Sequence, residues 1–171
     1  MAGHDLLHGF PPVSAADARI LILGSMPGRA SLDAGRYYAH PRNHFWPIVG
    51  AVLGFAPDLE YTERAARLIE HRIALWDVLR NCKREGSLDS AIDRTSLVPN
   101  DFAAFFAEHR EIESIVFNGA AAESLYLRHV WHNGVRYYRM PSTSPANATY
   151  TFQQKLEAWC SVLAGGSEWP R

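Results

Sequence analysis

The chain has 171 residues, of which 47% are hydrophobic and 20% charged, and its formal net charge is −1 at pH 7. This composition is typical of a globular protein and excludes a disordered or fibrous chain. A chain of this length buries roughly 70% of its unfolded surface, so we expect a single domain over residues 1–171 that needs no disulfide or metal. The near-neutral charge gives no general attraction for nucleic acid, although a local basic cluster would suffice to bind phosphates.

The cysteines and the hydropathy of the chain indicate its cellular location. Cys82 and Cys160 match no spacing typical of a metal or redox site, so we expect two reduced thiols and no metal ion. Residues 1–10 lack the apolar core of a signal peptide. No apolar run approaches the roughly 20 residues that a membrane span needs. We therefore expect a cytoplasmic protein that does not contact membranes.

Taken in chain order, the patterns predict alternating strands and helices. The first half contains a strand over 19–23, a long loop over 25–43, helices over 45–53 and 59–71, and a strand over 73–79 that runs into a loop holding Lys83, Arg84, Ser87 and Asp89. The second half contains a helix from an Asn100 N-cap to His109, a strand over 112–117, a helix over 120–129, a strand over 135–140, a polar loop over 141–149 and a final helix over about 152–163.

This alternation predicts an α/β fold, a three-layer αβα sandwich with a mostly parallel central sheet of about four strands. In such sheets the ligand crevice lies beyond the carboxyl ends of the strands. Two loops with unusual chemistry leave strand ends, residues 24–46 and 141–148. Function is expected there.

The first loop combines glycine, arginine and aromatic residues. Gly24 and Gly28 permit close backbone approach, and exposed backbone N–H groups in such a loop can bind an anion. Residues 19–44 hold four arginines against one acid, Asp33. Basic groups interleaved with aromatics suit a nucleobase held on a ring face with phosphates nearby. An ordinary strand-to-helix junction, with Phe45 and Trp46 as core residues, explains the same pattern, so both interpretations stand.

The residues of the first loop resemble motif 1 of the uracil-DNA glycosylase superfamily. The nearer match within it is the deoxyinosine (hypoxanthine) DNA glycosylase family, which is related to the mismatch-specific uracil and thymine glycosylases. The matching residues are Gly24-Ser25-Met26-Pro27-Gly28, Ser31, Tyr38, His40-Pro41, Asn43 and Phe45-Trp46. The resemblance extends over nearly the whole chain, from about residue 5 to residue 163.

The resemblance implies roles for the first loop. Asn43 would orient the attacking water, because an amide can both donate and accept, and backbone N–H groups at Gly24 and Ser25 would stabilise the departing base. An N-cap role for Asn43 before Phe45 is the structural alternative, and the two are compatible. Base-binding positions would be Tyr38, as the stacking ring, with Met26, His40 and Phe45. Met26 stands where the mismatch-specific branch has its water-positioning Asn, which is a departure from that branch.

The second loop resembles motif 2 of the same superfamily, which enters the minor groove. Its usual His or Asn is replaced here by Ser142. A loop that merely caps the last helix is the structural alternative. The residue types suit contacts with phosphate oxygens, and the expected DNA-binding positions are Arg42, Arg84, Ser87, Ser142, Thr143, Ser144 and Asn147. Asp77 or Asp89 would order a loop or help to read the base.

Together these features predict a monomeric, monofunctional DNA glycosylase without metal or cofactor. It would act on DNA that contains deaminated bases, with hypoxanthine in deoxyinosine as the expected substrate and water as the attacking group at C1′. The matched loops hold no lysine suited to act as a nucleophile, so lyase activity is not expected. Two alternatives remain open: a uracil, xanthine or mismatch-specific glycosylase, and a non-catalytic binder of nucleic acid or nucleotide on the same scaffold.

Overall fold

A parallel sheet of four strands, in the order β3-β2-β6-β7, forms the centre of the protein. The computed structural model describes residues 5–130 and 134–165. The strands are β2 (Ile20–Gly24), β3 (Ile73–Asp77), β6 (Ser114–Asn118) and β7 (Arg136–Met140). Strand β2 pairs with β3 and β6, and the register sets Gly24 opposite Asp77 and Leu23 opposite Phe117. The carboxyl ends of these three strands therefore meet at one edge of the sheet.

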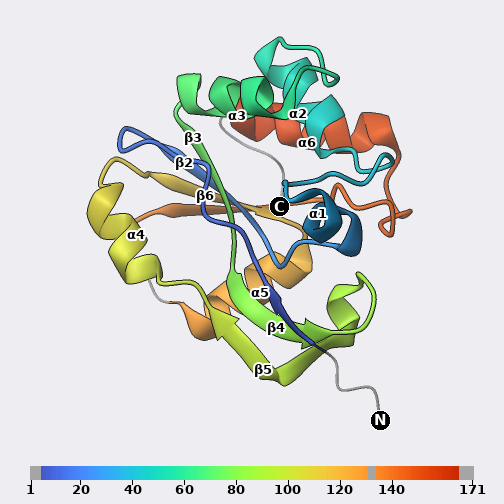
Figure 1. Ribbon diagram of the computed structural model, residues 1–171. Coiled ribbons are helices and arrows are strands. Elements are labelled where there is room, and N and C mark those ends of the chain that lie inside the picture. Colours follow the sequence, from blue (N-terminus) through green and yellow to red (C-terminus); the bar gives the residue numbers. More distant parts are fainter. Residues whose placement is uncertain (1–4, 131–133, 166–171) are drawn as a thin grey trace.

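Helices cover both faces of this sheet (Figure 1). On one face lie α2 (Phe45–Leu53), α3 (Tyr61–Glu70) and α6 (Phe152–Leu163). On the opposite face lie α4 (Phe102–Glu108) and α5 (Ala120–His129). Aromatic contacts join this second helix layer to the sheet, such as that of Phe117 in β6 with Tyr126 in α5. The predicted α/β sandwich with a four-stranded parallel sheet is confirmed.

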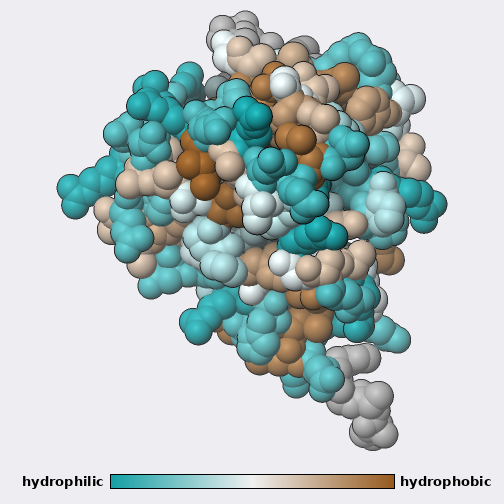
Figure 2. Space-filling view, turned by 45° about the horizontal axis from the view of Figure 1, so that its top comes forward, coloured by the Kyte–Doolittle hydropathy of each residue, from teal (hydrophilic) through white to brown (hydrophobic). Residues whose placement is uncertain are grey.

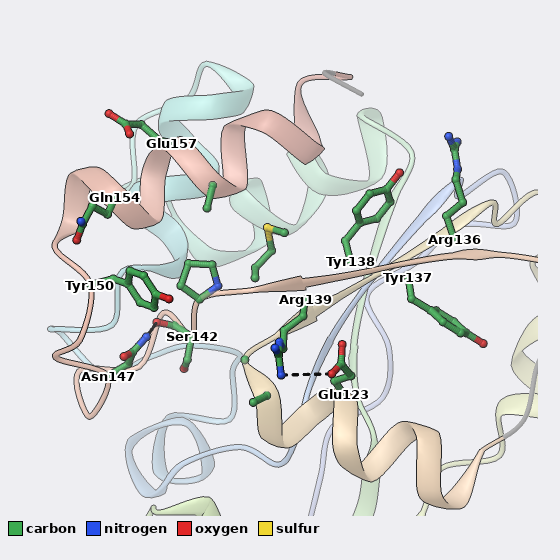
Figure 3. Close-up of a pocket in the computed structure, with 15 residues that line it drawn as sticks. Glu123, Arg136, Tyr137, Tyr138, Arg139, Ser142, Asn147, Tyr150, Gln154 and Glu157 are labelled. Atoms are coloured by element: carbon green, nitrogen blue, oxygen red, sulfur yellow. Dashed lines mark hydrogen bonds and ion pairs between the residues drawn. The ribbon is translucent and has the colours of Figure 1, made fainter. Parts of the chain in front are cut away.

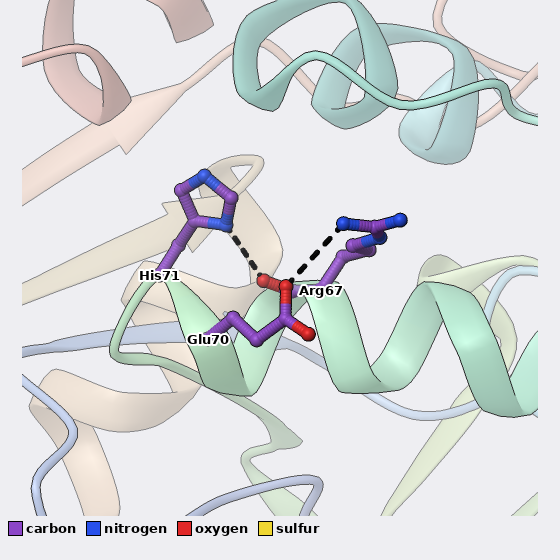
Figure 4. Close-up of polar contacts among 3 residues, drawn as sticks. All are labelled: Arg67, Glu70 and His71. Carbon is purple, nitrogen blue, oxygen red and sulfur yellow. Dashed lines mark hydrogen bonds and ion pairs between the residues drawn. The ribbon is translucent and has the colours of Figure 1, made fainter.

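Local sequence explains where the helices begin and end. Helix α6 begins with a capping box, in which the Thr151 hydroxyl accepts from the Gln154 N–H while the Gln154 side chain accepts from the Thr151 N–H. Helix α3 ends at Glu70, where Arg67 pairs with the Glu70 carboxylate and His71 Nδ1 lies 2.8 Å from the Arg67 carbonyl oxygen (Figure 4). These contacts satisfy backbone groups that a helix end leaves without intrahelical partners.

A second, antiparallel sheet was not expected from the sequence. It contains β1 (Leu6–His8), β4 (Leu79–Arg84) and β5 (Ile92–Pro99) in the order β1-β4-β5. The prediction of a loop after the strand over 73–79 is therefore wrong, because β3 ends at Asp77 and the chain re-enters a strand after Val78. Strand β4 pairs with residues far away in the chain, and short polar strands of this kind carry little local signal.

Two further local predictions differ from the structure. The long loop over 25–43 contains a short helix, α1 (Arg29–Ala34). The N-cap of α4 is Asp101 rather than Asn100, since the Asp101 carboxylate accepts from the Ala104 N–H at 3.0 Å. The Asn100 amide instead donates to the Asp77 carbonyl oxygen at 2.8 Å. Asn100 therefore supports the end of β3 near the expected crevice.

Hydrophilic side chains cover most of the face seen in Figure 2, and hydrophobic groups appear there as small patches between them. Among the helices of the described residues, we find none with the length and apolar character to cross a membrane.

The α6 capping box gives a stability prediction. Replacing Thr151 by Ala removes the side-chain acceptor for the Gln154 N–H, so the free energy of unfolding should fall by about 1 kcal/mol. Urea denaturation of the variant and of Thr149→Ala, an exposed threonine in the preceding loop, measures the difference. Equal midpoints for the two variants would contradict the capping role.

Candidate active site

A cavity of about 150 Å³ opens at the carboxyl ends of β2, β3 and β6. Both loops in which the sequence analysis expects function, the loop after β2 and the loop after β7, contribute to its wall. Of the predicted site residues, those that line it are Gly24, Ser25, Met26, Tyr38, His40, Asn43, Ser87, Ser142, Thr143 and Ser144. The fold therefore brings Tyr38 and Asn43, the proposed stacking and water-orienting residues, into the same cavity.

Gly24 is the tightest point of this wall. A Cβ atom at position 24 would collide with the Asp77 carboxylate and would lie 2.9 Å from the Tyr38 hydroxyl. The chain stays close after β3, because the Val78 N–H donates to the Gly24 carbonyl and the Leu79 N–H to the Ser25 carbonyl. Only a residue without a side chain fits between these groups.

Asp77 is the most perturbed acid of the cavity. Its side chain is 4% exposed, and its Oδ2 atom has no hydrogen-bond partner among the described residues. Burial and the nearby Asp89 raise the pKa of Asp77 to about 7, against an opposing effect of Arg84. Asp77 is therefore a neutral or half-ionised carboxyl group at physiological pH, with one oxygen left for a ligand.

Asp89 lies at the rim of the cavity. The residue as a whole is exposed, but its carboxylate is turned inward and accepts from the Ser25 hydroxyl at 2.5 Å. Burial of the carboxylate raises the pKa of Asp89, while Ser25 and Arg84 lower it. This bond ties the loop after β4 to the loop after β2.

Tyr38 is held in a strained and enclosed position. Its φ of 54° lies in the left-handed region, which is uncommon for a bulky residue. Burial and the neighbouring Asp77 raise the pKa of its hydroxyl, while the nearby Asn118 side chain lowers it. Within the described part of the chain this hydroxyl has no partner with full hydrogen-bond geometry. The ring stacks on Phe45 with centroids 4.1 Å apart. Phe45 itself is fully buried and outside the cavity wall, so its predicted contact with a base is corrected: Phe45 supports Tyr38.

Asn43 and His40 are fixed by local backbone groups. The Asn43 Oδ1 atom accepts from the N–H of Phe45, the first residue of α2, at 2.9 Å. The N-cap of α2 is His44, so the N-cap alternative for Asn43 is wrong, although its side chain does bind the start of the helix. His40 Nδ1 accepts from the Arg42 N–H at 3.1 Å, which places the proton of the neutral ring on Nε2 as a donor. Arg42 itself is exposed and does not line the cavity.

The loop after β7 is anchored by Asn118, the last residue of β6, which lies just past the predicted strand over 112–117. Its side-chain amide donates to the Thr143 hydroxyl and accepts from the Thr143 N–H, each at 2.9 Å. Thr143 is fully buried, so its predicted role as a phosphate contact is corrected to an anchor of the loop. The sequence offered one signal for Asn118, since it is a polar residue at the end of a buried apolar strand.

A buried lysine of α6 also holds the loop after β7. Lys155 of α6 is 1% exposed and donates to the Asn147 carbonyl at 3.0 Å, with His44 Nδ1 at 3.4 Å. Burial lowers the pKa of Lys155. Asn147 does not line the cavity, and its side-chain amide donates to the Ser142 carbonyl. The Asn147 side chain therefore helps to hold the loop, and its contact with DNA stays a prediction.

Arg84 is a structural residue rather than a surface contact. It is 3% exposed, and its guanidinium donates to the Pro27 carbonyl at 2.6 Å and to the Gly86 carbonyl at 3.0 Å. The predicted DNA-backbone contact is wrong for this reason. Ser87 is exposed at the rim, and its hydroxyl accepts from the Arg29 N–H at 2.9 Å.

A broader hollow, about 1280 Å³, runs along β7 between α5 and α6 (Figure 3). Tyr138 and Arg136 point to the α6 side of the strand in this view, and Arg139 reaches Glu123 of α5 at 3.5 Å. Ser142 borders both this hollow and the cavity at the strand ends. The hollow contains no counterpart of the buried acid and glycine cradle described above.

A family model described as the uracil DNA glycosylase superfamily matches residues 11–163. The chain belongs to this superfamily. The match includes both loops of the cavity and all strands of the parallel sheet, and it confirms the resemblance found in the motifs.

Two curated relatives and one solved structure are similar to this chain. A hypoxanthine DNA glycosylase of Methanosarcina acetivorans is 35% identical over 156 residues, which cover 91% of this chain and 96% of the relative. One of Methanosarcina barkeri is 38% identical over 112 residues, which cover 65% of this chain and 70% of the relative. The NMR structure of a Methanosarcina acetivorans protein, assigned provisionally as a uracil DNA glycosylase, has a TM-score of 0.78 at 33% identity, covering 96% of this chain and 100% of that chain.

The raised pKa of Asp77 gives a prediction about this superfamily member's stability. Below the ordinary value of 3.8 the carboxyl is protonated in both states, and above it the unfolded chain ionises first. The free energy of unfolding should therefore fall as pH rises towards about 7, by roughly 4 kcal/mol at most, and level off above that.

Asp77→Asn removes this dependence while keeping the shape of the side chain. Relative to the wild type, the variant should gain stability between pH 5 and pH 8 in urea denaturation. The exposed Asp58→Asn serves as the control. Parallel pH curves for the wild type and Asp77→Asn would refute a buried neutral carboxyl.

Proposed function

We propose that the protein is a DNA glycosylase that hydrolyses the N-glycosidic bond of a flipped-out deaminated base, with hypoxanthine in deoxyinosine as the substrate. The observation that carries the proposal is the cavity that Gly24, Tyr38, Asn43 and Asp77 share at the strand ends. The relatives named hypoxanthine DNA glycosylase support the choice of base. C1′ is hidden in stacked DNA, so the nucleotide must leave the helix to reach such a cavity.

Tyr38 provides the surface on which the everted base stacks. One face of its ring is covered by Phe45, and the residue lines the cavity. Support from a fully buried ring holds Tyr38 in place before the base arrives, so little ordering is required on binding. Gly24 complements this by letting the base approach the backbone, where N–H groups can donate to its carbonyl oxygen.

Asp77 reads the edge of the base in this proposal. The hypoxanthine ring presents an N–H donor beside a carbonyl acceptor, and a neutral carboxyl can accept from the former and donate to the latter. Asp77 lines the cavity, and its Oδ2 atom, which has no hydrogen-bond partner among the described residues, would make one of these two bonds while Oδ1 makes the other. As the glycosidic bond breaks, negative charge develops on the base, and a proton donor at its carbonyl stabilises that charge. An ionised Asp77 would instead repel it.

Asn43 orients the water that attacks C1′. Its Oδ1 atom is held by the Phe45 N–H and keeps a second lone pair for a water proton. Attack forms the new C1′–O bond as the bond to the base nitrogen breaks, and the base leaves with the bonding electron pair. The bound water gives up one proton to solvent and the departing base takes up one, so that OH remains on C1′ and the base is released neutral. Lys155, the buried lysine near this region, does not line the cavity, which supports water rather than an amine as the attacking group.

A panel of oligonucleotides tests the function. The protein should release base from DNA containing inosine in preference to uracil, xanthine or a T·G mismatch, and strand nicking should appear only after alkali. Asn43→Ala should lower the rate by roughly 100-fold or more, since catalytic positioning and proton handling account for rate factors of this order.

The exposed amide variant Gln153→Ala is the matched control and should retain the wild-type rate. If no substrate in the panel is cut while DNA binding persists, the non-catalytic binder is correct. Release of uracil or xanthine alone would support the glycosylase assignment but would identify a different substrate base.

A pH profile tests Asp77 separately. The rate of base release should fall as pH rises through about 7, because the neutral carboxyl is then lost. In Asp77→Asn, whose amide both donates and accepts at every pH, the fall should be absent. A wild-type profile that rises through this range would assign Asp77 a charged role instead.

A further inference from the structure

His44 is the residue at which the two loops of the cavity meet. It lies between Asn43, which lines the cavity, and Phe45, which supports Tyr38. Its own N–H donates to the Thr143 carbonyl oxygen at 3.0 Å, and Thr143 belongs to the loop after β7. A shift of that loop at this bond is therefore passed to the backbone beside Asn43.

Helix α6 places two side chains against the ring of His44. Phe152 and Lys155 are three residues apart, so both lie on the same face of this helix. The Phe152 ring packs edge-on against the His44 ring, with centroids 5.1 Å apart. The Lys155 Nζ atom lies 3.4 Å from His44 Nδ1 and donates to the Asn147 carbonyl oxygen at 3.0 Å. Lys155 thus contacts both loops, because His44 lies at the end of the first and Asn147 in the second.

The ammonium group of Lys155 is buried without a carboxylate partner. Lys155 is 1% exposed, and among the described residues no acid forms an ion pair with it. Burying such a charge is costly unless its N–H groups are hydrogen-bonded. An ammonium ion has donors and no acceptor, so His44 Nδ1 is the acceptor and the proton of the neutral ring lies on Nε2. The charge is stabilised only while both acceptors stay in place, and it therefore holds the two loops at one spacing.

This spacing matters for the proposed reaction, because each loop forms part of the cavity wall. A displacement of about 1 Å in a positioned group can cost roughly 100-fold in rate. We propose, resting on the glycosylase function above, that Lys155 is a positioning residue: its ammonium ion sets the spacing of the two loops and thereby aligns the Asn43 amide with C1′ of the bound nucleotide. Lys155 itself does not line the cavity and acts only through its neighbours.

Lys155→Met tests the charge, because methionine keeps an unbranched side chain of similar length without the ammonium ion. The single-turnover release of hypoxanthine from DNA that contains inosine should fall about tenfold. Lys155→Arg, which keeps a charged donor, should recover part of the rate. Lys83→Met, at the other lysine of the chain, is the matched control, since Lys83 is exposed on β4, and it should keep the wild-type rate. If Lys155→Met does not fold, Lys155→Gln, which keeps an amide donor without the charge, replaces it throughout.

A double-mutant cycle tests whether Lys155 acts through Asn43. In an Asn43→Ala background, Lys155→Met should change the remaining rate by less than about twofold, because no amide is left to align. A lysine that only stabilises the fold would slow both backgrounds equally. Equal slowing would therefore overturn the proposal.

Nitrogen NMR of the His44 ring tests the contact itself. Burial and the Lys155 charge lower the pKa of His44. In the wild type, Nδ1 should be the unprotonated nitrogen of the neutral ring, and in Lys155→Met the pKa of His44 should rise because the nearby charge is gone. An unchanged His44 pKa would contradict the proposed contact.

The activity of the wild type separates the two proposals. If the wild type releases no base from DNA that contains inosine, the glycosylase function and the role of Lys155 both fail. If the wild type is active and Lys155→Met keeps its rate, the role of Lys155 alone is refuted and the glycosylase function stands.

Discussion

The whole site depends on how closely three strand ends approach one another at Gly24. The backbone of β2 passes beside the Asp77 carboxylate and the Tyr38 hydroxyl with no room for a side chain. This approach buries an acid without a cationic partner in direct contact and holds a tyrosine at a positive φ. Such conformations are costly and persist only where the surrounding packing fixes them. Here the packing comes from Phe45 beneath Tyr38 and from the completely buried strand β3.

The two loops that form the cavity are positioned by different means. The loop after β2 is held through Arg84 and Asp89 of the antiparallel sheet and its continuation. The loop after β7 is held through Asn118 and Lys155, which belong to the parallel sheet and to α6. The small second sheet is therefore part of the functional architecture, because it carries the side chains that fix one wall of the cavity.

Elements with a strong local signal could be predicted from the sequence. The helices at Phe45–Leu53 and Ala120–His129 were predicted with their observed bounds, the first because Gly54 ends it and the second because good helix formers follow Gly119. Strands β4 and β5 could not be, since many of their residues are polar and β4 also pairs with β1 at the start of the chain. At the site, spacing and residue type indicated Tyr38 and Asn43, but the burial of Arg84, Thr143 and Phe45 depends on packing between distant segments. The sequence analysis named Asp77 only as an alternative to Asp89. Burial in the fold raises the pKa of Asp77, and the sequence pattern does not show that burial.

The open side of β7 has a consequence for the behaviour of the protein in solution. In the sheet formed by the described residues β7 is the last strand, and it carries Arg136 and Arg139 beside the hollow between α5 and α6. Cationic side chains on an outermost strand oppose its pairing with the same strand of another molecule, because like charges would be brought together. Arg139 already pairs with Glu123, so we expect most of this repulsion to come from Arg136, and a neutral substitution there to favour pairing of β7 with a second copy.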